Sequence, residues 1–397
     1  MRMTMVVALL VSSLSANPYV DSDPANAETG VLVIWPTARS TALAGAMTGL
    51  ADEADATYFN PAGLAFQKRP KAYITYARWL PGWRPGMCYA SATGGAPLRV
   101  PSLQGHSTYV SGSLVYLTRG EEEIINERNE LLGRVNVWRA AAGAHVGLVV
   151  TNTLGVGLGL KLVRSSYCNY DVWWDGSVVE LRSSAWTPDM NTAITAAADV
   201  GLLYRPFSQL SIGAIVANLG PRVVYRPSGA SDELPRTARL GLCWRAVESR
   251  DFRLRIMPEL DKLLVSMFRD TTGRKPLGRK LEEEWKDARR ALGIEATAFR
   301  LVSIRLGYFE DLTNQRGGIM LENRDGQTYH YGIWDALSRK SLGKLKSIGL
   351  CWGFGIGYKD YLRFDVSDDG AIYDWPTSNW KFSLVADDIA GGIRELR

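Results

Sequence analysis

Most of the chain after residue 67 consists of short segments in which apolar and polar residues alternate. Leu158, Leu160 and Leu162 occupy every second position between glycines and a lysine, and the same period recurs around 362–366 and 380–384. A period of two is typical of β-strands, because successive side chains point to opposite faces. We count about fourteen such segments. They lie near residues 68–79, 85–93, 107–118, 138–149, 154–166, 192–205, 209–219, 236–247, 251–261, 290–299, 301–310, 346–358, 360–368 and 378–387.

The connections between these segments differ in length in a regular way. From the fourth segment onward, short ones near 151–153, 206–208, 248–250, 300 and 359 alternate with long ones near 167–191, 220–235, 262–289 and 311–345. Membrane β-barrels have short turns at one rim and long loops at the other. The sequence therefore predicts an all-β protein: one transmembrane antiparallel β-barrel of about fourteen strands over residues 67–387.

Composition fits this prediction and excludes other classes. By length alone, 397 residues would suggest several soluble domains, but one large closed sheet can absorb the whole chain. The 39 glycines and 13 tryptophans are many for a soluble α/β enzyme and ordinary for a barrel with tight turns and interfacial aromatic residues. The net charge of +5 is small and its lysines and arginines are scattered, so we expect no nucleic-acid partner.

The two ends of the chain read differently from the barrel. Residues 1–16 resemble a secretory signal peptide, with Arg2 followed by an apolar stretch too short to span a bilayer as a helix. We expect residues 17–66 to form an N-terminal extension and a hatch, which is a segment that plugs the lumen of the barrel. We expect residues 388–397 to form a polar tail. The charged stretches 121–134 and 277–292 are helix-compatible and fall in predicted long loops.

Charged residues occupy the polar row of several predicted strands. On a membrane barrel the apolar row faces lipid and the polar row faces the lumen. These charges either pair with each other and with hatch carboxylates such as Asp52, Glu53 and Asp55, or contact a ligand, and both interpretations stay open. Candidate lumen charges are Lys161, Arg253, Arg255, Glu259, Arg305, Arg363 and Asp365. Tryptophans near strand ends could form interfacial girdles: Trp79, Trp83, Trp138, Trp244, Trp352 and Trp380.

Residues 37–65 do not show a strand pattern. The stretch is rich in alanine, glycine and threonine, which allow close approach of neighbouring backbones. Asn60–Gly63 indicates a turn followed by a short helical start with Pro61 near its first position. A segment with such small side chains can fold inside a barrel and plug its lumen.

This stretch resembles the N-terminal hatch of FadL-like outer-membrane barrels, most closely that of the PorV/PorQ family. The order of 217–225 (ANLGPRVVY) and 234–241 (LPRTARLG) resembles the same family, as do 259–265, 304–310 and 379–385. Outer-membrane barrels typically end on an aromatic residue, whereas here Phe382 lies inside the last segment and a polar tail follows. The hatch residues that we single out are Arg39, Gly45, Asp52, Tyr58, Asn60, Pro61 and Gly63.

The resemblance implies two different functions. PorV-like proteins act in type IX secretion, where they receive cargo bearing a C-terminal signal domain and deliver it to a cell-surface attachment complex with a sortase-like subunit. FadL-like proteins pass hydrophobic small molecules, such as long-chain fatty acids, across the outer membrane. We expect a bacterial outer-membrane protein in contact with lipid, a PorV-like carrier first and a FadL-like channel as the alternative.

Enzymatic and metal sites have little support in the residues. The only histidines are His106, His145 and His330, and no GxSxG elbow is present. The four cysteines lie far apart without a CxxC motif, so neither a zinc site nor a disulfide pairing can be assigned. The glycine-rich runs fall within predicted strands, where they would make room for a hatch. We therefore expect no enzyme activity, no metal and no cofactor.

Overall fold

The computed structural model describes residues 30–79, 86–98, 108–125, 131–166, 172–174, 179–181, 192–226, 231–265, 267–268, 275–286, 288–310, 320–322, 328–330, 349–358, 361–368 and 380–387. The predicted signal peptide (1–16), His106, Trp83, Cys168, most of 311–345 and the polar tail (388–397) lie outside these residues.

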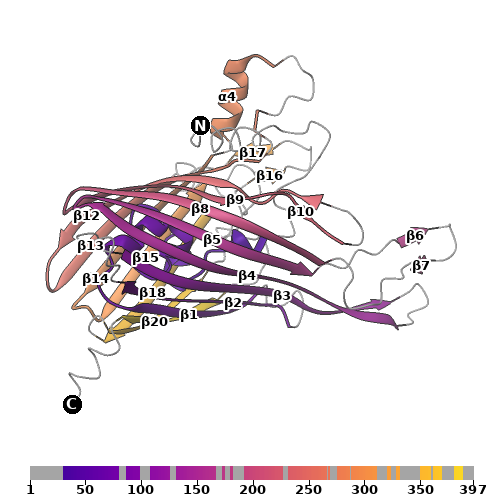
Figure 1. The fold of residues 1–397 in the computed structure, drawn as a ribbon, viewed down its shortest axis with the longest axis horizontal. Helices are drawn as coiled ribbons and strands as arrows, with labels where there is room; N and C mark the ends of the chain where they lie inside the picture. Colours follow the sequence, from indigo (N-terminus) through magenta and orange to yellow (C-terminus); the bar gives the residue numbers. More distant parts are fainter. Residues whose placement is uncertain are drawn as a thin grey trace.

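Fourteen antiparallel strands form a closed barrel, in which every strand pairs with its neighbours and β20 returns to β1 (Figure 1). The prediction of an all-β antiparallel barrel of about fourteen strands is therefore confirmed. The strands are β1 Lys71–Arg78, β2 Cys88–Leu98, β3 Thr108–Ile125, β4 Leu131–Thr151, β5 Leu154–Ser166, β8 Thr192–Phe207, β9 Leu210–Leu219, β12 Thr237–Glu248, β13 Phe252–Leu263, β14 Arg289–Ala298, β15 Val302–Glu310, β18 Gly349–Tyr358, β19 Leu362–Asp368 and β20 Trp380–Asp387.

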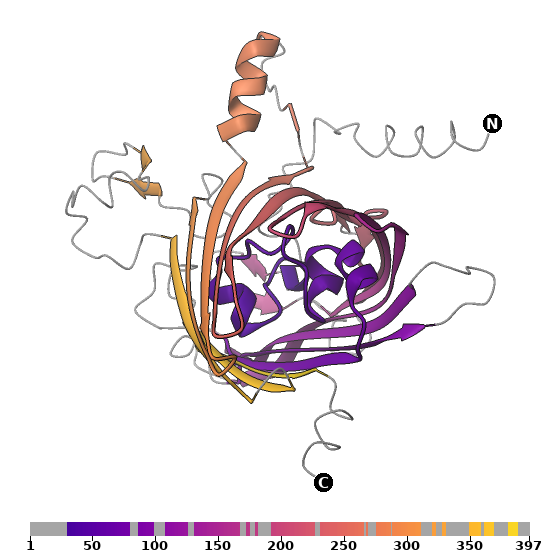
Figure 2. The same cartoon turned by 90° about the vertical axis from the view of Figure 1, so that its left-hand side faces the viewer.

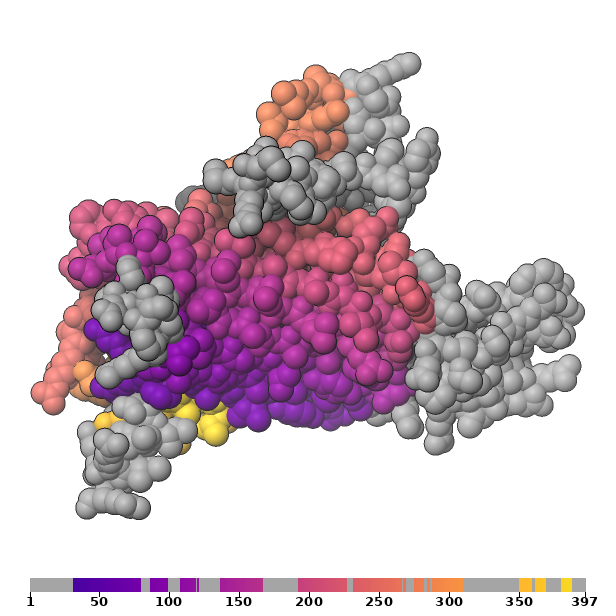
Figure 3. Space-filling view, in the orientation of Figure 1, coloured from indigo at the N-terminus to yellow at the C-terminus, as the bar shows by residue number. Residues whose placement is uncertain are grey.

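The two faces of the wall have opposite chemistry. The outward row is apolar, as at Leu160 (68% exposed) and Ile304 (60% exposed), whereas inward side chains such as Asp365 and Arg305 are buried. In the space-filling view these strands form a continuous outer surface on the side shown (Figure 3). An apolar exterior around a polar interior is the arrangement of a barrel that spans a membrane.

The two rims of the barrel differ as expected from the connection lengths. Tight turns join β4 to β5, β8 to β9, β12 to β13, β14 to β15 and β18 to β19 at one end. Longer connections at the other end carry three small two-stranded sheets, β6–β7 (Val172–Trp174, Val179–Leu181), β10–β11 (Val223–Val224, Ser231–Asp232) and β16–β17 (Met320–Glu322, Thr328–His330). We call these the short-turn end and the long-loop end. Within the described residues, no helix has both the length and the apolar character needed to cross a membrane.

Three sequence interpretations need correction. The described parts of the charged stretch, 121–125 and 131–134, are strand and not helix. The backbone ladder of β3 and β4 continues outward through the pairs Glu121–Asn136 and Glu123–Arg134, and this pairing outweighs local helix propensity. The helix predicted over 277–292 is shorter: α4 covers Leu277–Lys286, and Arg289 already belongs to β14. Trp79 is no girdle residue, because it is buried against Tyr89.

The N-terminal segment lies inside the barrel. Residues 30–66 contain the 3₁₀ helix η2 (Gly30–Leu32), the short helices α2 (Ala38–Ala42) and α3 (Ala56–Phe59), and the 3₁₀ helix η3 (Pro61–Phe66). Seen along the barrel from the short-turn end, these elements occupy the space within the ring of strands (Figure 2). We call residues 30–66 the internal segment.

Side chains of the wall form hydrogen bonds with the irregular backbone of the internal segment. Buried N–H and C=O groups need partners, and short helices leave many of them unpaired. Ser383 Oγ accepts the Ala38 N–H at 2.8 Å, and Ser211 Oγ donates to the Gly49 carbonyl at 2.6 Å. The polar row of the wall thus holds the segment in one register.

Candidate functional site

The internal segment and the wall meet at backbone level where the wall has glycine. A Cβ at Gly307 would lie 2.5 Å from the Ala44 nitrogen, and one at Gly157 would collide with Ala62 and Pro61. Gly213 faces the Thr48 carbonyl with the same lack of room. Part of the glycine-rich interpretation is therefore correct, but Gly159 and Gly355 make room for wall side chains instead of the internal segment.

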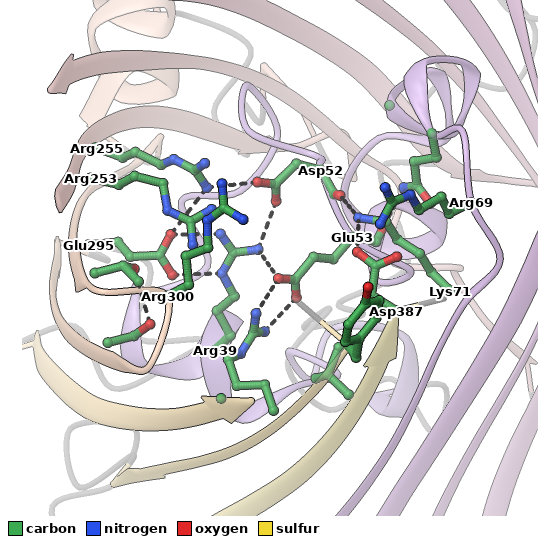
Figure 4. Close-up of a pocket in the computed structure, with 18 of the residues that line it drawn as sticks. Arg39, Asp52, Glu53, Arg69, Lys71, Arg253, Arg255, Glu295, Arg300 and Asp387 are labelled. Atoms are coloured by element: carbon green, nitrogen blue, oxygen red, sulfur yellow. Dashed lines mark hydrogen bonds and ion pairs between the residues drawn. The ribbon is translucent and has the colours of Figure 1, made fainter. Parts of the chain in front are cut away.

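A network of arginines and carboxylates fastens the internal segment to the wall. Arg39 on α2 makes a bidentate pair with Glu295 on β14, at 2.8 and 2.7 Å, and also contacts Asp52 at 2.7 Å and Glu53 at 2.9 Å. Its guanidinium lies between the wall carboxylate and the two segment carboxylates (Figure 4). Arg39 is buried, so each of its N–H groups has to find a protein partner.

Three arginines of the wall complete this network. Arg255 on β13 reaches Asp52 at 2.8 Å, and Arg363 on β19 forms a bidentate pair with Glu53 at 2.6 and 2.7 Å. Arg305 on β15 bridges Glu295 and Asp365, at 2.8 and 2.7 Å. We call the four arginines (Arg39, Arg255, Arg305, Arg363) and four carboxylates (Asp52, Glu53, Glu295, Asp365) the charge cluster.

The arginines keep the segment carboxylates ionised. Burial alone would raise the pKa of Asp52, but Arg39 and then Arg255 outweigh it and hold that pKa well below its usual range. Burial likewise opposes ionisation of Glu53, yet Arg363 and Arg39 lower its pKa to about 2. Asp52 and Glu53 are therefore ionised at neutral pH and form ionic links between the internal segment and the wall.

The structure places the predicted lumen charges on the inner wall in several groups. Arg255, Arg305, Arg363 and Asp365 belong to the charge cluster, and Arg253 lines the cavity beside it. Glu259 accepts the Thr48 N–H at 2.8 Å, so it contacts the segment elsewhere. Lys161 pairs with another wall residue, Asp199 on β8, at 2.8 Å. Among the described residues, it forms no ion pair or hydrogen bond with the internal segment.

Two wall residues that sequence reasoning did not single out are central to these contacts. Glu295 binds both Arg39 and Arg305, and Lys381 donates to the Trp35 carbonyl at 2.7 Å and to Thr41 Oγ1 at 2.8 Å. Both are charged residues on the polar row of an otherwise apolar strand. That pattern is the signal that could have found them.

The hatch residues play local structural parts. Gly45 has a positive φ of 73°, and a Cβ there would collide with Trp35, so only glycine suits this turn. Asn60 caps η3 by accepting the Ala62 N–H, and it donates to Leu202 of β8 at 2.8 Å. Pro61 is at the first position of η3, so the short helical start predicted there is a 3₁₀ helix.

Tyr58 and Gly63 contribute packing. Arg239 of β12 lies over the Tyr58 ring at 4.8 Å from its centroid and donates to its carbonyl at 3.4 Å. A side chain at Gly63 would collide with Ala51, which lies across the fold of the internal segment. Five of the seven hatch residues therefore contact the wall, namely Arg39, Asp52, Tyr58, Asn60 and Pro61. The other two, Gly45 and Gly63, shape the segment itself.

Asp55 differs from its neighbours because none of the described arginines forms an ion pair with it. It accepts a hydrogen bond from Thr37 Oγ1 at 2.9 Å, while burial and then the nearby charge of Glu53 raise its pKa to about 7. An acid whose folded-state pKa is raised loses stabilisation as pH increases from its unfolded pKa, about 4, through its folded pKa.

We therefore expect Asp55→Asn to flatten the pH dependence of stability. Relative to this variant, the native protein should become progressively less stable between about pH 4 and about pH 7, with no further change above. Urea titrations of vesicle-embedded protein at several pH values measure this difference. Asp251→Asn, at an exposed turn position, is the matched control. A constant difference between native protein and Asp55→Asn across this range would contradict the prediction.

A basic cavity of about 590 Å³ opens beside the charge cluster at the short-turn end (Figure 4). Its basic side chains outnumber its acidic ones by ten to four. Arg205 lies with its guanidinium 4.0 Å from the centroid of the Phe66 ring, which fixes its direction at the cavity wall. Besides members of the charge cluster, the basic lining comprises Lys68, Arg69, Lys71, Arg205, Arg245, Arg253 and Arg300. Such a cavity favours anionic groups.

An apolar cluster lies toward the other end of the lumen. Val31 and Leu32 of the internal segment pack in one cluster with Trp79, Tyr89 and Leu117 of the wall side. The connection between β9 and β12 folds onto this cluster. Its residues Val223, Tyr225 and Leu234 are buried there.

Asn218 shapes this connection. It adopts a positive φ of 60°, donates to the Pro235 carbonyl at 2.9 Å and presents its N–H to Asp199 at 2.8 Å. The stretches 217–225 and 234–241, which carry the family resemblance, thus close the long-loop end of the lumen.

The single described imidazole on the inner wall is His145. Its Nε2 lies 2.9 Å from Ser113 Oγ, and the ring lies next to Gly143 and Gly159, where side chains would collide with it. Asp199 is engaged by Lys161 and Asn218, and no described hydrogen-bond partner meets His145 Nδ1. This group is a buried polar contact between strands.

None of the three cysteines among the described residues, Cys88, Cys243 and Cys351, forms a disulfide.

Comparisons with known proteins identify distant structural likenesses. No protein-family model and no curated protein sequence matches this chain. The solved structure of the toluene transporter TodX of Pseudomonas putida is 10% identical, covers 88% of this chain and 97% of its own, and gives a TM-score of 0.48. A Pseudomonas aeruginosa FadL homologue is 10% identical over 89% and 98%, with a TM-score of 0.48. The toluene transporter TbuX of Ralstonia pickettii is 11% identical over 88% and 97%, with a TM-score of 0.47. The fold described above rests on the strand pairing of this chain itself.

Proposed function

We propose that this chain is an outer-membrane channel for hydrophobic small molecules, gated by its internal segment. The observation that carries the proposal is that the lumen is filled by a separate piece of chain, tied to the wall by ion pairs and hydrogen bonds. Smaller barrels of eight strands are filled by their own wall side chains, whereas wider ones leave a lumen. A filling that is bound noncovalently can shift without breaking the barrel.

The chemistry of the two ends supports passage of molecules with an apolar part. A solute entering at the long-loop end meets the apolar cluster around Trp79 and Tyr89. The same solute would leave through the basic cavity beside Arg255 and Arg363. The charge cluster joins the internal segment to the wall beside this exit, so movement of the segment would open the path.

A disulfide between the internal segment and the wall tests the gate. A Cβ built on Gly293 of β14 lies 3.2 Å from the Leu43 Cβ, close to the spacing of about 3.5–4.5 Å in disulfides. We expect oxidised Leu43→Cys/Gly293→Cys to lose uptake of toluene and of a long-chain fatty acid, and reduction to restore it.

Single variants control for bridges to native thiols. Cys243 and Cys351 share an apolar cluster with Leu43, so Leu43→Cys alone and Gly293→Cys alone reveal any such bridge. Uptake that persists in the oxidised double variant overturns the channel proposal.

A second candidate is a PorV-like carrier for secreted proteins in type IX secretion. The observation in its favour is the tight fit of the internal segment, together with a long-loop end closed by the stretches that carry the PorV-like resemblance. A carrier works from its outer loops and needs no open lumen. Affinity purification of the intact barrel from native outer membrane in mild detergent tests this. Recovery of a sortase-like subunit, or of proteins sharing one C-terminal domain, supports the carrier, and recovery of the barrel alone counts against it.

A further inference from the structure

The helix α4 presents an apolar stripe that nothing in the described barrel covers. Leu277, Leu281 and Trp285 recur every four residues, so they share one face of the helix. They are 68%, 52% and 60% exposed. Arg279 projects from roughly the opposite face, because it is two residues from Leu277 and Leu281. A helix with this division is amphipathic.

The anchors of α4 lie on the outward row of the barrel. Glu284 forms an ion pair with Lys262 of β13 at 2.7 Å. Arg290 of β14 lies over the Trp285 ring, 5.1 Å from its centroid, and donates to the Trp285 carbonyl at 3.0 Å. Lys262 and Arg290 alternate with inward residues such as Asp261 and Arg289, so the helix is held on the outer side of the wall.

Lys262 and Arg290 also mark the border of the apolar exterior on the side of the long-loop end. Toward the long-loop end, the outward row of β13 runs through Ile256, Pro258 and Leu260 before it reaches Lys262. On β14 the corresponding row runs through Ile294 and Leu292 before it reaches Arg290. The apolar band of a membrane barrel ends at the interface, where tryptophan is enriched. Helix α4 is therefore fixed at the level of the membrane surface.

The direction of α4 agrees with this level. Figures 1 and 2 both show the helix outside the wall, with its axis leading away from the barrel and across the direction of the strands. Because the strands cross the membrane, a helix with this direction runs along the membrane surface.

We propose that α4 is an interfacial helix that inserts Leu277, Leu281 and Trp285 into the boundary between lipid headgroups and acyl chains. Its occupant is the lipid surface, since the stripe continues the apolar band of the wall at the band's own border. Basic residues on the polar side of an interfacial helix face the headgroups, and Arg279 lies on that side of α4. The inference rests on the placement of the barrel in a membrane and is independent of what the barrel passes.

Depth-dependent quenching of a fluorescent label tests the proposal. The full chain, with Cys88 and Cys168 replaced by serine, carries the label NBD on Leu281→Cys, on Arg279→Cys or on Ile304→Cys. The protein is reconstituted in phosphatidylcholine vesicles that contain a lipid with a nitroxide near the headgroup or along the acyl chain. We expect the shallow nitroxide to quench the label at 281 several-fold more than at 279, and Ile304→Cys to be quenched by the deep nitroxide.

Three outcomes overturn the inference or its basis. Equal quenching at 281 and 279 shows that the stripe does not insert. A label at 281 that is shielded from aqueous iodide but not quenched by nitroxide lipid shows that a protein, such as a second copy, covers the stripe. Absence of quenching at Ile304→Cys removes the membrane placement itself. In a further variant with the label on Leu277→Cys, Leu281→Asp should lower shallow quenching while the heat-dependent gel shift of the barrel stays unchanged.

Discussion

Replacing Arg39 by alanine is expected to lower the stability of the barrel by about 3–5 kcal/mol and to loosen the internal segment. The variant leaves Asp52, Glu53 and Glu295 without the guanidinium that all three share. Glu295 keeps Arg305, Glu53 keeps Arg363 and Asp52 keeps Arg255, but the charge cluster is left with one uncompensated negative charge. The loss falls on the link between segment and wall, because Arg39 is the only basic residue of the internal segment in the charge cluster.

Two variants separate this effect from a general loss of charge. Arg39→Lys keeps the charge but cannot make the bidentate pair with Glu295, so it should recover only part of the stability. Arg222→Ala breaks a half-exposed pair with Glu233 and should cost about 0–1 kcal/mol. The measurements are urea titration in vesicles and the temperature at which the folded band disappears on gels.

The same variant gives a functional readout. If the ion pairs hold the internal segment in place, Arg39→Ala should raise ion conductance in planar bilayers and make the segment accessible to protease. A variant with native stability and native conductance would show that the charge cluster does not hold the segment.

The barrel was predictable because its signal is repeated along the chain. Alternation at Leu158, Leu160 and Leu162 fixes which side chains face outward, and each further segment repeats the argument. The alternation of short and long connections predicted that turns lie at one end of the barrel and long loops at the other, without any tertiary information. Strand ends were less predictable, as the extension of β3 and β4 through Glu121–Asn136 shows. There, cross-strand pairing decides the conformation, and a single sequence does not contain it.

The sequence predicted which kinds of residue form the candidate site, but not which of them pair with each other. Sequence reasoning placed Arg255 and Arg363 on the polar row and proposed Asp52 and Glu53 as partners. It could not tell that Asp55 would accept a hydrogen bond from Thr37 instead, because the tertiary fold of the internal segment decides which of its carboxylates meets an arginine. Lys161 shows the same limit. Its partner Asp199 lies on β8, and the long connection between β5 and β8 separates the two residues in the sequence.

Gly157→Val is expected to displace the internal segment from the wall of β5. The new side chain would overlap Ala62 and Pro61, whose backbone is confined in η3 and cannot rotate away as a flexible side chain would. Overpacking of this kind typically costs about 1–3 kcal/mol when side chains can adjust, and backbone contact leaves less room for adjustment. Gly213→Val, which meets Thr48 from β9, should have a similar effect from another part of the wall.

Gly112→Val is the matched control for both variants. This glycine lies on β3 with only the Gly143 carbonyl oxygen nearby, 3.9 Å from its Cβ position, and valine favours strands. We therefore expect Gly112→Val to keep native stability and conductance, whereas Gly157→Val and Gly213→Val lose stability and gain conductance. Equal losses in all three would place the cost in the strand backbone instead of the fit. Lost stability without gained conductance at Gly157 and Gly213 would mean that the internal segment can be strained but does not gate the lumen.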